Sequence, residues 1–297
     1  NITNQMILTY NNATTAKILL DVQESRSVGF HSSGVVMQQT IATYSDISKT
    51  LLIDVKTIEN SAISTSGNVG VSVITKYSGC TIATGGTGLI TPTGAIDRQT
   101  ITTLTFDVRG NATSQNILKE YYNSATSAFV FSERQTVANL SFDIHDRATR
   151  SQVKNYSDAA GAIFRDMQDI TYNSFDQFGN ALSQTIDTYT SQTVDAAFIV
   201  NHKKITNTYS DIVAQRKGNA WISVVDTYKT TLETLANQID QTTSTTTSFD
   251  TLGNAVDQTQ ITKVYNGTSL VEASKRVIRN SSYDNRGDAA IQTVSSY

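Results

Sequence analysis

Cysteine, proline, tryptophan and charge are all scarce in this chain of 297 residues. Its single cysteine, Cys80, excludes an internal disulfide framework. Charged residues make up 16% of the chain and the net charge is −3, so the sequence carries no basic surface of the kind that binds nucleic acid. No apolar run approaches the roughly 20 residues that a membrane-spanning helix needs. The sequence therefore predicts neither a nucleic-acid partner nor a membrane span.

Residues that would mark a reaction centre are equally sparse. The three histidines, His31, His145 and His202, fall at unrelated positions, whereas a zinc site needs several ligands that converge. Serine and threonine account for 75 residues, so a serine near a histidine carries almost no information about a nucleophile. From these observations we predict no enzyme, no cofactor and no metal site.

One short pattern, in contrast, recurs through almost the whole chain. Residues 175–189 read F-D-Q-F-G-N-A-L-S-Q-T-I-D-T-Y. Counted from the glycine of this turn motif, an aromatic residue lies four positions before and an aspartate three before. A small apolar residue follows at +2, glutamine at +5, isoleucine or valine at +7, and tyrosine at +10. The anchors of the pattern are Gly34, Gly67, Gly110, Asp146, Gly179, Gly218, Gly253 and Gly287.

The anchors are 33 to 43 residues apart, and such a period is typical of a repeat architecture. We therefore expect an all-β protein with about eight tandem β-hairpin repeats of about 36 residues, stacked into an elongated rod or solenoid-like array. Residues 1–297 are expected to form a single array. The first ten residues fit the positions after a missing glycine, which suggests an excerpt of a longer repeated chain.

The turn motif has the chemistry of a β-hairpin. Aspartate can cap a turn through its side chain, and glycine supplies the positive φ that ends a short loop. Calcium loops use similar residues, but the spacing lacks the EF-hand pattern. The predicted turn residues are Asp107, Gly110, Asn111, Asp176, Gly179, Asn180, Asp250, Gly253, Asn254, Asp284 and Gly287.

A second polar turn and an apolar run follow each tyrosine position. Residues 128–131 and 197–200 are two such runs, and both are predicted to be strands. Residues 158–165 and 232–237 occupy the same place in the pattern. A helix is an alternative for both of these segments, but the shared position favours strands.

The +10 column contains Tyr10, Tyr44, Tyr77, Tyr156, Tyr189, Tyr228 and Tyr297. Like residues at one position of a stack pack on each other, so the column predicts a stacking ladder. A carbohydrate-binding surface is the alternative. The glutamines at +5 suggest a second ladder, built from side-chain amides.

Asn-x-Ser/Thr sequons occur seven times, and about five would arise by chance at this composition. Besides Asn1, the candidate glycosylation sites are Asn12, Asn111, Asn139, Asn155, Asn266 and Asn280.

The aromatic-Asp-x-x-Gly core at Phe106, Phe175, Phe249 and Tyr283 resembles the YD repeat of rearrangement-hotspot and teneurin-like proteins. The period of the present chain is longer than that of the usual YD unit. The resemblance implies β-hairpin repeats in a secreted or surface-exposed setting.

Together these features predict a segment of an extracellular fibre or cell-surface filament. Copies of the chain would assemble head-to-tail by β-strand addition, through residues 1–10 at one end and the hairpin that ends at Tyr297 at the other. The alternative is an adhesin or binding module that displays loops such as 78–98 and 211–218 to a protein, glycan or host surface. A closed propeller of about eight blades is a third possibility.

Overall fold

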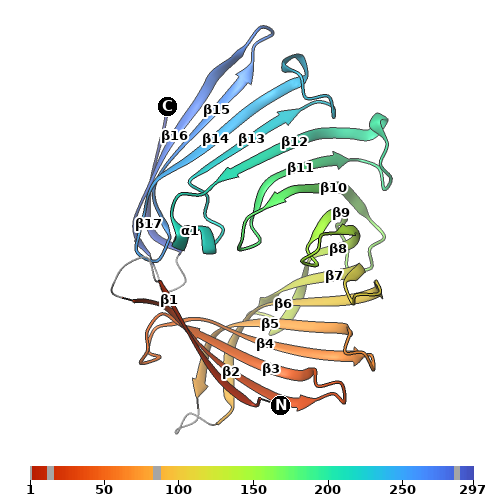
Figure 1. The fold of residues 1–297 in the computed structure, drawn as a ribbon, viewed down its shortest axis with the longest axis vertical. Coiled ribbons are helices and arrows are strands. Elements are labelled where there is room, and N and C mark those ends of the chain that lie inside the picture. Colours follow the sequence, from red (N-terminus) through yellow and green to blue (C-terminus); the bar gives the residue numbers. More distant parts are fainter. Residues whose placement is uncertain (1, 12–16, 83–87, 284–287) are drawn as a thin grey trace. The chain divides into compact units, whose positions relative to one another are not determined.

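A computed structural model describes residues 2–11, 17–82, 88–283 and 288–297. The prediction of an all-β protein is confirmed, because these residues form 17 antiparallel strands of one sheet (Figure 1). The strands are β1 (Asn4–Asn11), β2 (Ile18–Phe30), β3 (Val36–Tyr44), β4 (Leu52–Ile63), β5 (Val69–Ile82), β6 (Ile90–Phe106), β7 (Ala112–Asn123), β8 (Ala128–Phe142), β9 (Ala148–Tyr156), β10 (Phe164–Phe175), β11 (Ala181–Tyr189), β12 (Ile199–Thr208), β13 (Ile222–Tyr228), β14 (Gln238–Phe249), β15 (Ala255–Tyr265), β16 (Leu270–Tyr283) and β17 (Ala289–Ser296).

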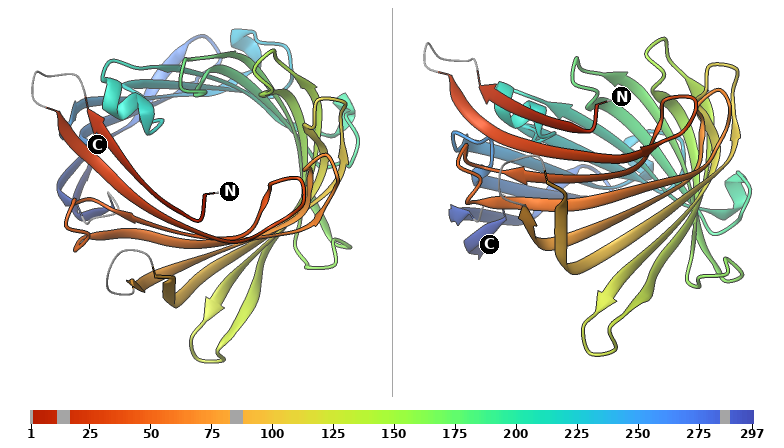
Figure 2. Two further views of the ribbon diagram at one scale, coloured as in Figure 1. Left: turned by 60° about the horizontal axis from the view of Figure 1, so that its bottom comes forward. Right: turned by 90° about the horizontal axis from the view of Figure 1, so that it is seen from below.

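The chain divides into two compact units. Unit 1 contains Asn1–Ala138 and Asn155–Phe164, and unit 2 contains Asn139–Lys154 and Arg165–Tyr297. In unit 1 each strand pairs with the next one along the chain, from β1 to β8, and the orange and brown strands run side by side in both views of Figure 2. In unit 2 the same antiparallel pairing runs from β10 to β17.

Five-residue turns join strands at the turn motif. In the turn at 107–111, Asp107 N donates to Asn111 O at 2.9 Å and Gly110 N donates to Asp107 O at 3.1 Å. Gly110 has a φ of +90°, which a residue with a Cβ adopts only with strain. The turns at 176–180 and 250–254 have the same pair of bonds, so a local sequence rule accounts for this hairpin geometry.

A β-bulge precedes the +10 position in seven strands of the described chain. The register shifts directly before Tyr10, Tyr44, Tyr77, Glu120, Tyr189, Tyr228 and Lys263. One extra residue in one strand of a pair turns the following side chain to another direction. The bulge therefore sets where the +10 side chain lies relative to the regular strand before it.

The strand prediction was wrong for 158–163 and for 232–237, whereas Phe164 and Arg165 do lie in a strand. Residues 157–163 form a turn, in which Asp158 accepts hydrogen bonds from Ala162 N at 3.1 Å and Ile163 N at 2.6 Å. The second segment contains a short 3-10 turn at Leu235–Asn237, and Ala196–Phe198 forms another in place of the first residues of a predicted strand. Side-chain caps from Asp158 and Asp195 therefore overrode strand propensity at two of these positions, whereas the turn at Leu235–Asn237 has no such cap.

Two elements account for the long intervals between anchors. In unit 1, β5 and β6 extend beyond Tyr77, and Cys80 pairs with Pro92 in the added part of the ladder. Ile90 from this extension packs into the apolar core of the unit, with Val22, Ala42, Tyr44 and Val55. In unit 2, the added residues form the short helix α1 (Ile212–Arg216), which the sequence analysis missed.

A local signal for α1 is present in the sequence. Asp211 caps the helix by accepting hydrogen bonds from Val213 N and Ala214 N, both at 2.8 Å. Gly218, with a φ of +77°, follows its last turn. An N-cap aspartate and a glycine just after the C-terminus are the usual helix boundaries.

Candidate functional site

Three predicted turns have one set of side-chain bonds in common. Asp176 Oδ1 accepts from Phe178 N and Asn180 N, and its Oδ2 accepts from Asn180 Nδ2, all at 2.8 Å. Asp107 with Asn111, and Asp250 with Asn254, have the same three bonds at 2.8–3.0 Å. The remaining predicted turn residues, Asp284 and Gly287, lie outside the described residues.

The hydrogen bonds in the turns at 107–111 and 176–180 favour ionised aspartate. The N–H of Asn111 is the main cause that lowers the pKa of Asp107 below its ordinary value. Burial opposes ionisation of Asp176, but hydrogen bonds from Asn180 and Gln215 still lower its pKa. The carboxylates of Asp107 and Asp176 are therefore held as acceptors at neutral pH.

Neighbouring turns of unit 2 are also bonded to each other. Asn180 Nδ2 donates to Gln215 O at 2.6 Å, and Gln215 Nε2 returns a bond of 2.8 Å to Asp176 Oδ2. On the other side of α1, Asn219 Nδ2 donates to Gly253 O at 2.9 Å. A Cβ on Gly253 would lie 2.7 Å from Ala214 N, so glycine is needed there for close approach of the helix as well as for its φ of +79°. Gln215 of α1 and the nearby Asn219 therefore bond to the turns at 176–180 and 250–254.

A bond between hairpins was not predicted from the sequence. Asn60, Asn207 and Asn280 donate from Nδ2 to the carbonyl oxygens of Val36, Ala181 and Ala255, at 2.9, 3.0 and 2.8 Å. The acceptors are the +2 residues of the preceding turn motif. Asparagine recurs seven residues before Gly67, Asp146 and Gly287, and that signal would have pointed to the bond.

The tyrosines at +10 are mostly buried, but each contacts different neighbours. Tyr44, Tyr156, Tyr189 and Tyr228 are buried, Tyr10 and Tyr77 are half-buried, and Tyr297 is 78% exposed. Tyr156 meets Phe164 edge-on at 6.1 Å, and Tyr228 lies 5.9 Å from the ring of His202. No ring contact among the described residues joins two tyrosines of this column.

The glutamines at +5 bond across to the paired strand. Gln115 Nε2 donates to Thr103 Oγ1 and Gln258 Nε2 to Thr246 Oγ1, both at 3.1 Å. Gln39 donates to Ser25 Oγ at 2.8 Å. These bonds join an amide to a hydroxyl within one hairpin, and they satisfy polar groups on the face of the sheet.

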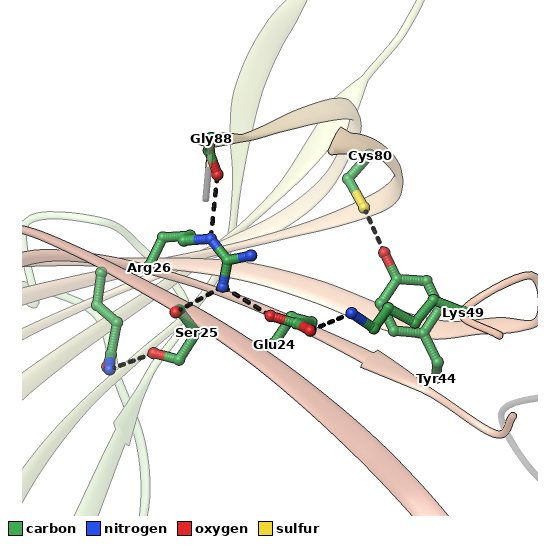
Figure 3. A network of polar contacts seen from close by, with 8 residues as sticks. Glu24, Ser25, Arg26, Tyr44, Lys49, Cys80 and Gly88 are labelled. Carbon is green, nitrogen blue, oxygen red and sulfur yellow. Dashed lines mark hydrogen bonds and ion pairs between the residues drawn. The ribbon is translucent and has the colours of Figure 1, made fainter. Parts of the chain in front are cut away.

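A buried ionic cluster in unit 1 lies where the extension of β5 and β6 meets β2 (Figure 3). Arg26, which is 2% exposed, donates from Nη1 to Glu24 Oε2 at 2.7 Å and from Nε to Gly88 O at 3.0 Å. Lys49 also bonds to Glu24. Burial opposes ionisation of Glu24, but these two cations hold its pKa below the ordinary value. The sequence offers no signal for this cluster, because Arg26 and Gly88 are 62 residues apart.

A small hollow of about 440 Å³ adjoins this cluster in unit 1. Tyr44, Lys49, Leu52, Cys80 and Ile82 contribute to its lining. The Tyr44 hydroxyl and Cys80 Sγ are 3.4 Å apart, and burial together with this contact raises the pKa of Tyr44. Tyr44 and Cys80 thus contact each other, and Lys49 bonds to Glu24.

Unit 2 has a second buried polar group, centred on His202. His202 Nδ1 lies 2.5 Å from Asp187 Oδ1, and its Nε2 lies 3.4 Å from Glu233 Oε1. Glu233 also pairs with Lys204 at 2.6 Å, and this bond is the main cause that lowers the pKa of Glu233. The arrangement fastens the loop that carries Glu233 to strand β12.

The candidate glycosylation sites are in different environments. Asn111, Asn139, Asn155 and Asn280 take part in the turns or the sheet through side-chain hydrogen bonds. Asn266 lies in the exposed turn between β15 and β16. Asn12 lies outside the described residues.

The described residues contain no group of three histidine, cysteine or carboxylate side chains with the arrangement of a metal site. Within the same ranges, no helix is long and apolar enough to traverse a bilayer.

A comparison with protein-family models and with curated proteins gives no match for this chain.

Proposed function

We propose that this chain is a structural segment of an extracellular filament and has no enzymatic role. In this proposal, about eight hairpin repeats of about 36 residues, similar to YD repeats, form an elongated array. Copies of the array associate head-to-tail when one copy adds a strand to the sheet of another.

The observation that carries the proposal is the bond from asparagine to the +2 carbonyl. It has the same donor and acceptor positions at Asn60, Asn207 and Asn280. In each case the donor lies in the hairpin that follows the acceptor's turn motif, so three pairs of consecutive hairpins are joined in the same way. A surface that complements its own repeat can propagate, because addition of one more unit recreates the same surface.

Strand β17 of unit 2 is the proposed place of such addition. It pairs with β16 through residues 289–296. Ile291 and Val294 are exposed on it, and Tyr297 is 78% exposed, whereas Tyr189 at the same position of β11 is 3% exposed. An exposed strand with apolar side chains is a template for pairing with another chain. A further strand would give Tyr297 the cover that β12 and its flanking loop give Tyr189.

Sedimentation velocity and negative-stain electron microscopy test this function. The unmodified chain is expected to form filaments that lengthen with concentration. Ile291→Lys/Val294→Lys is expected to abolish them, because charged residues on an edge strand oppose pairing. Val108→Lys, at a fully exposed turn in unit 1, is the matched control and leaves assembly unchanged.

A deletion of residues 1–11 tests the other end of the proposed contact, and loss of filaments is the expected result. A chain that stays monomeric at about 100 times the concentration needed for imaging would contradict head-to-tail assembly. Filaments that persist in the double lysine variant would contradict the role of β17.

A further inference from the structure

Four described sequon asparagines are committed to the fold. Asn111 Nδ2 donates to Asp107 Oδ2 at 3.0 Å, and Asn139 Oδ1 accepts from Ser151 at 2.7 Å. Asn155 is 3% exposed and accepts from Gln135 at 3.0 Å. The fourth, Asn280, is 9% exposed; its Nδ2 donates to a backbone carbonyl and its Oδ1 accepts from a glutamine.

Asn266 differs from these four in both exposure and bonding. It lies in the exposed turn between β15 and β16, followed by Gly267 and Thr268. Its Oδ1 accepts from Thr268 N and Ser269 N, both at 2.9 Å. Within the described part of the chain, its Nδ2 has no hydrogen-bond partner. Two hydrogen bonds therefore fix the side-chain oxygen of Asn266, while no acceptor in the described part of the chain engages its side-chain nitrogen.

The turn around Asn266 is itself well defined. Asn266 N donates to Ser269 O at 3.1 Å, and the Tyr265 hydroxyl donates to Gly267 O at 2.7 Å. Gly267 has a φ of +99° and no atom within 4 Å of an added Cβ, so the space beside the asparagine is open. A bulky group attached at this tip would displace no part of the sheet.

We propose that Asn266 is the site at which this chain carries an N-linked oligosaccharide. The proposal rests on the extracellular setting of the proposed function. In the transfer, the Asn266 Nδ2 forms a bond to the anomeric carbon of a lipid-linked oligosaccharide diphosphate. The bond from that carbon to the diphosphate breaks, the lipid diphosphate leaves, and a base of the transferase takes the amide proton.

A glycan on the committed asparagines conflicts with the folded sheet. On Asn280 Nδ2 it would replace the bond to Ala255 O and require space at a position that is 9% exposed. Loss of a buried hydrogen bond leaves a carbonyl without its partner, which is costly. The folded, secreted protein should therefore carry its glycan at Asn266 and none at Asn155 or Asn280.

The test is glycopeptide mass spectrometry of the full chain, secreted from a eukaryotic host behind an added signal peptide. Asn266 is expected to be occupied in most molecules. Asn266→Gln should abolish this glycan, whereas Thr268→Ser keeps the sequon and should retain it. If secretion fails, the same peptides are measured on chain translated into microsomes.

An unoccupied Asn266 in either preparation would overturn the proposal, as would a glycan on Asn155 or Asn280 in folded, secreted protein. Assembly is measured separately, on protein made without glycans. The outcome for Asn266 therefore does not decide whether the chain forms filaments, and the failure of one proposal is distinguishable from the failure of the other.

Discussion

The two insertions of this chain have opposite consequences. In unit 1 the added residues follow Tyr77, lengthen β5 and β6, and bring Ile90 and Gly88 onto the sheet. In unit 2 they fall within a turn and form α1, which bonds to the turns on both sides of it. The residues added after Tyr77 thus contribute to an apolar core. The residues added in the turn before Gly218 instead contribute hydrogen bonds between neighbouring turns.

The two units also differ in how they bury charged side chains. In unit 1, Arg26 and Glu24 are both buried and Arg26 bonds to Gly88, so the ionic pair depends on the residues that the extension supplies. In unit 2, His202 lies between carboxylates of a strand and of a loop. The first arrangement should be more sensitive to the loss of one partner, because a charge in an apolar surrounding has no other group to solvate it.

Arg26→Met is expected to have the largest effect on this contrast. It leaves Glu24 with Lys49 as its only cation among the contacts described above, and we expect a loss of about 4 kcal/mol in the free energy of unfolding. Urea denaturation measures it. Glu24→Gln/Arg26→Met should recover about half of the loss, because the buried carboxylate that lost one of its two cations is then absent. A single-variant cost below about 1 kcal/mol would show that water reaches this cluster.

Ile90→Ala tests the apolar part of the same cover. Ile90 is 4% exposed, and removal of its side chain is expected to cost about 3 kcal/mol. Hydrogen exchange should show lower protection in β3 and β4, while β13 and β14 keep theirs. Ile163→Ala, at an exposed position of unit 1, is the control and should cost less than about 0.5 kcal/mol. Equal losses from both variants would mean that the extension does not form a core.

Acid should have a smaller effect in the turns that contain Asp107 and Asp176. The pKa values of Asp107 and Asp176 are lowered in the folded chain, so their contribution to stability is complete above the unfolded value of about 3.9 and is lost as pH falls below it. Hydrogen exchange at pH 5 and pH 3 measures this loss turn by turn.

The turn at 64–68 is the internal control for the acid experiment. There Ser64 Oγ takes the place of the aspartate and accepts from Asn68 N at 3.0 Å. A hydroxyl does not titrate in this range, so protection of this turn should change least. An equal loss in all three turns would contradict the assignment of the acid effect to the aspartates.

Some features could be predicted from the sequence because their causes are local. The hairpin bonds at Asp107 and Asp176 join residues at most five positions apart, so the order of aspartate, glycine and asparagine is sufficient to predict a turn. The same locality explains the errors. The cap at Asp158 and the helix that begins after Asp211 also have local signals, although strand propensity and the period of the pattern predict otherwise.

The sequence by itself determined the all-β class, because the alternation of strand-forming segments and turn chemistry is present in every interval between anchors. Only the tertiary structure decided which side chains meet. Arg26 reaches Gly88, and His202 meets Asp187 and Glu233, through strand register and through loops that fold back on the sheet. These contacts depend on bulges and insertions that shift register by single residues. One such shift changes the partner of every later side chain, so a sequence pattern cannot determine them.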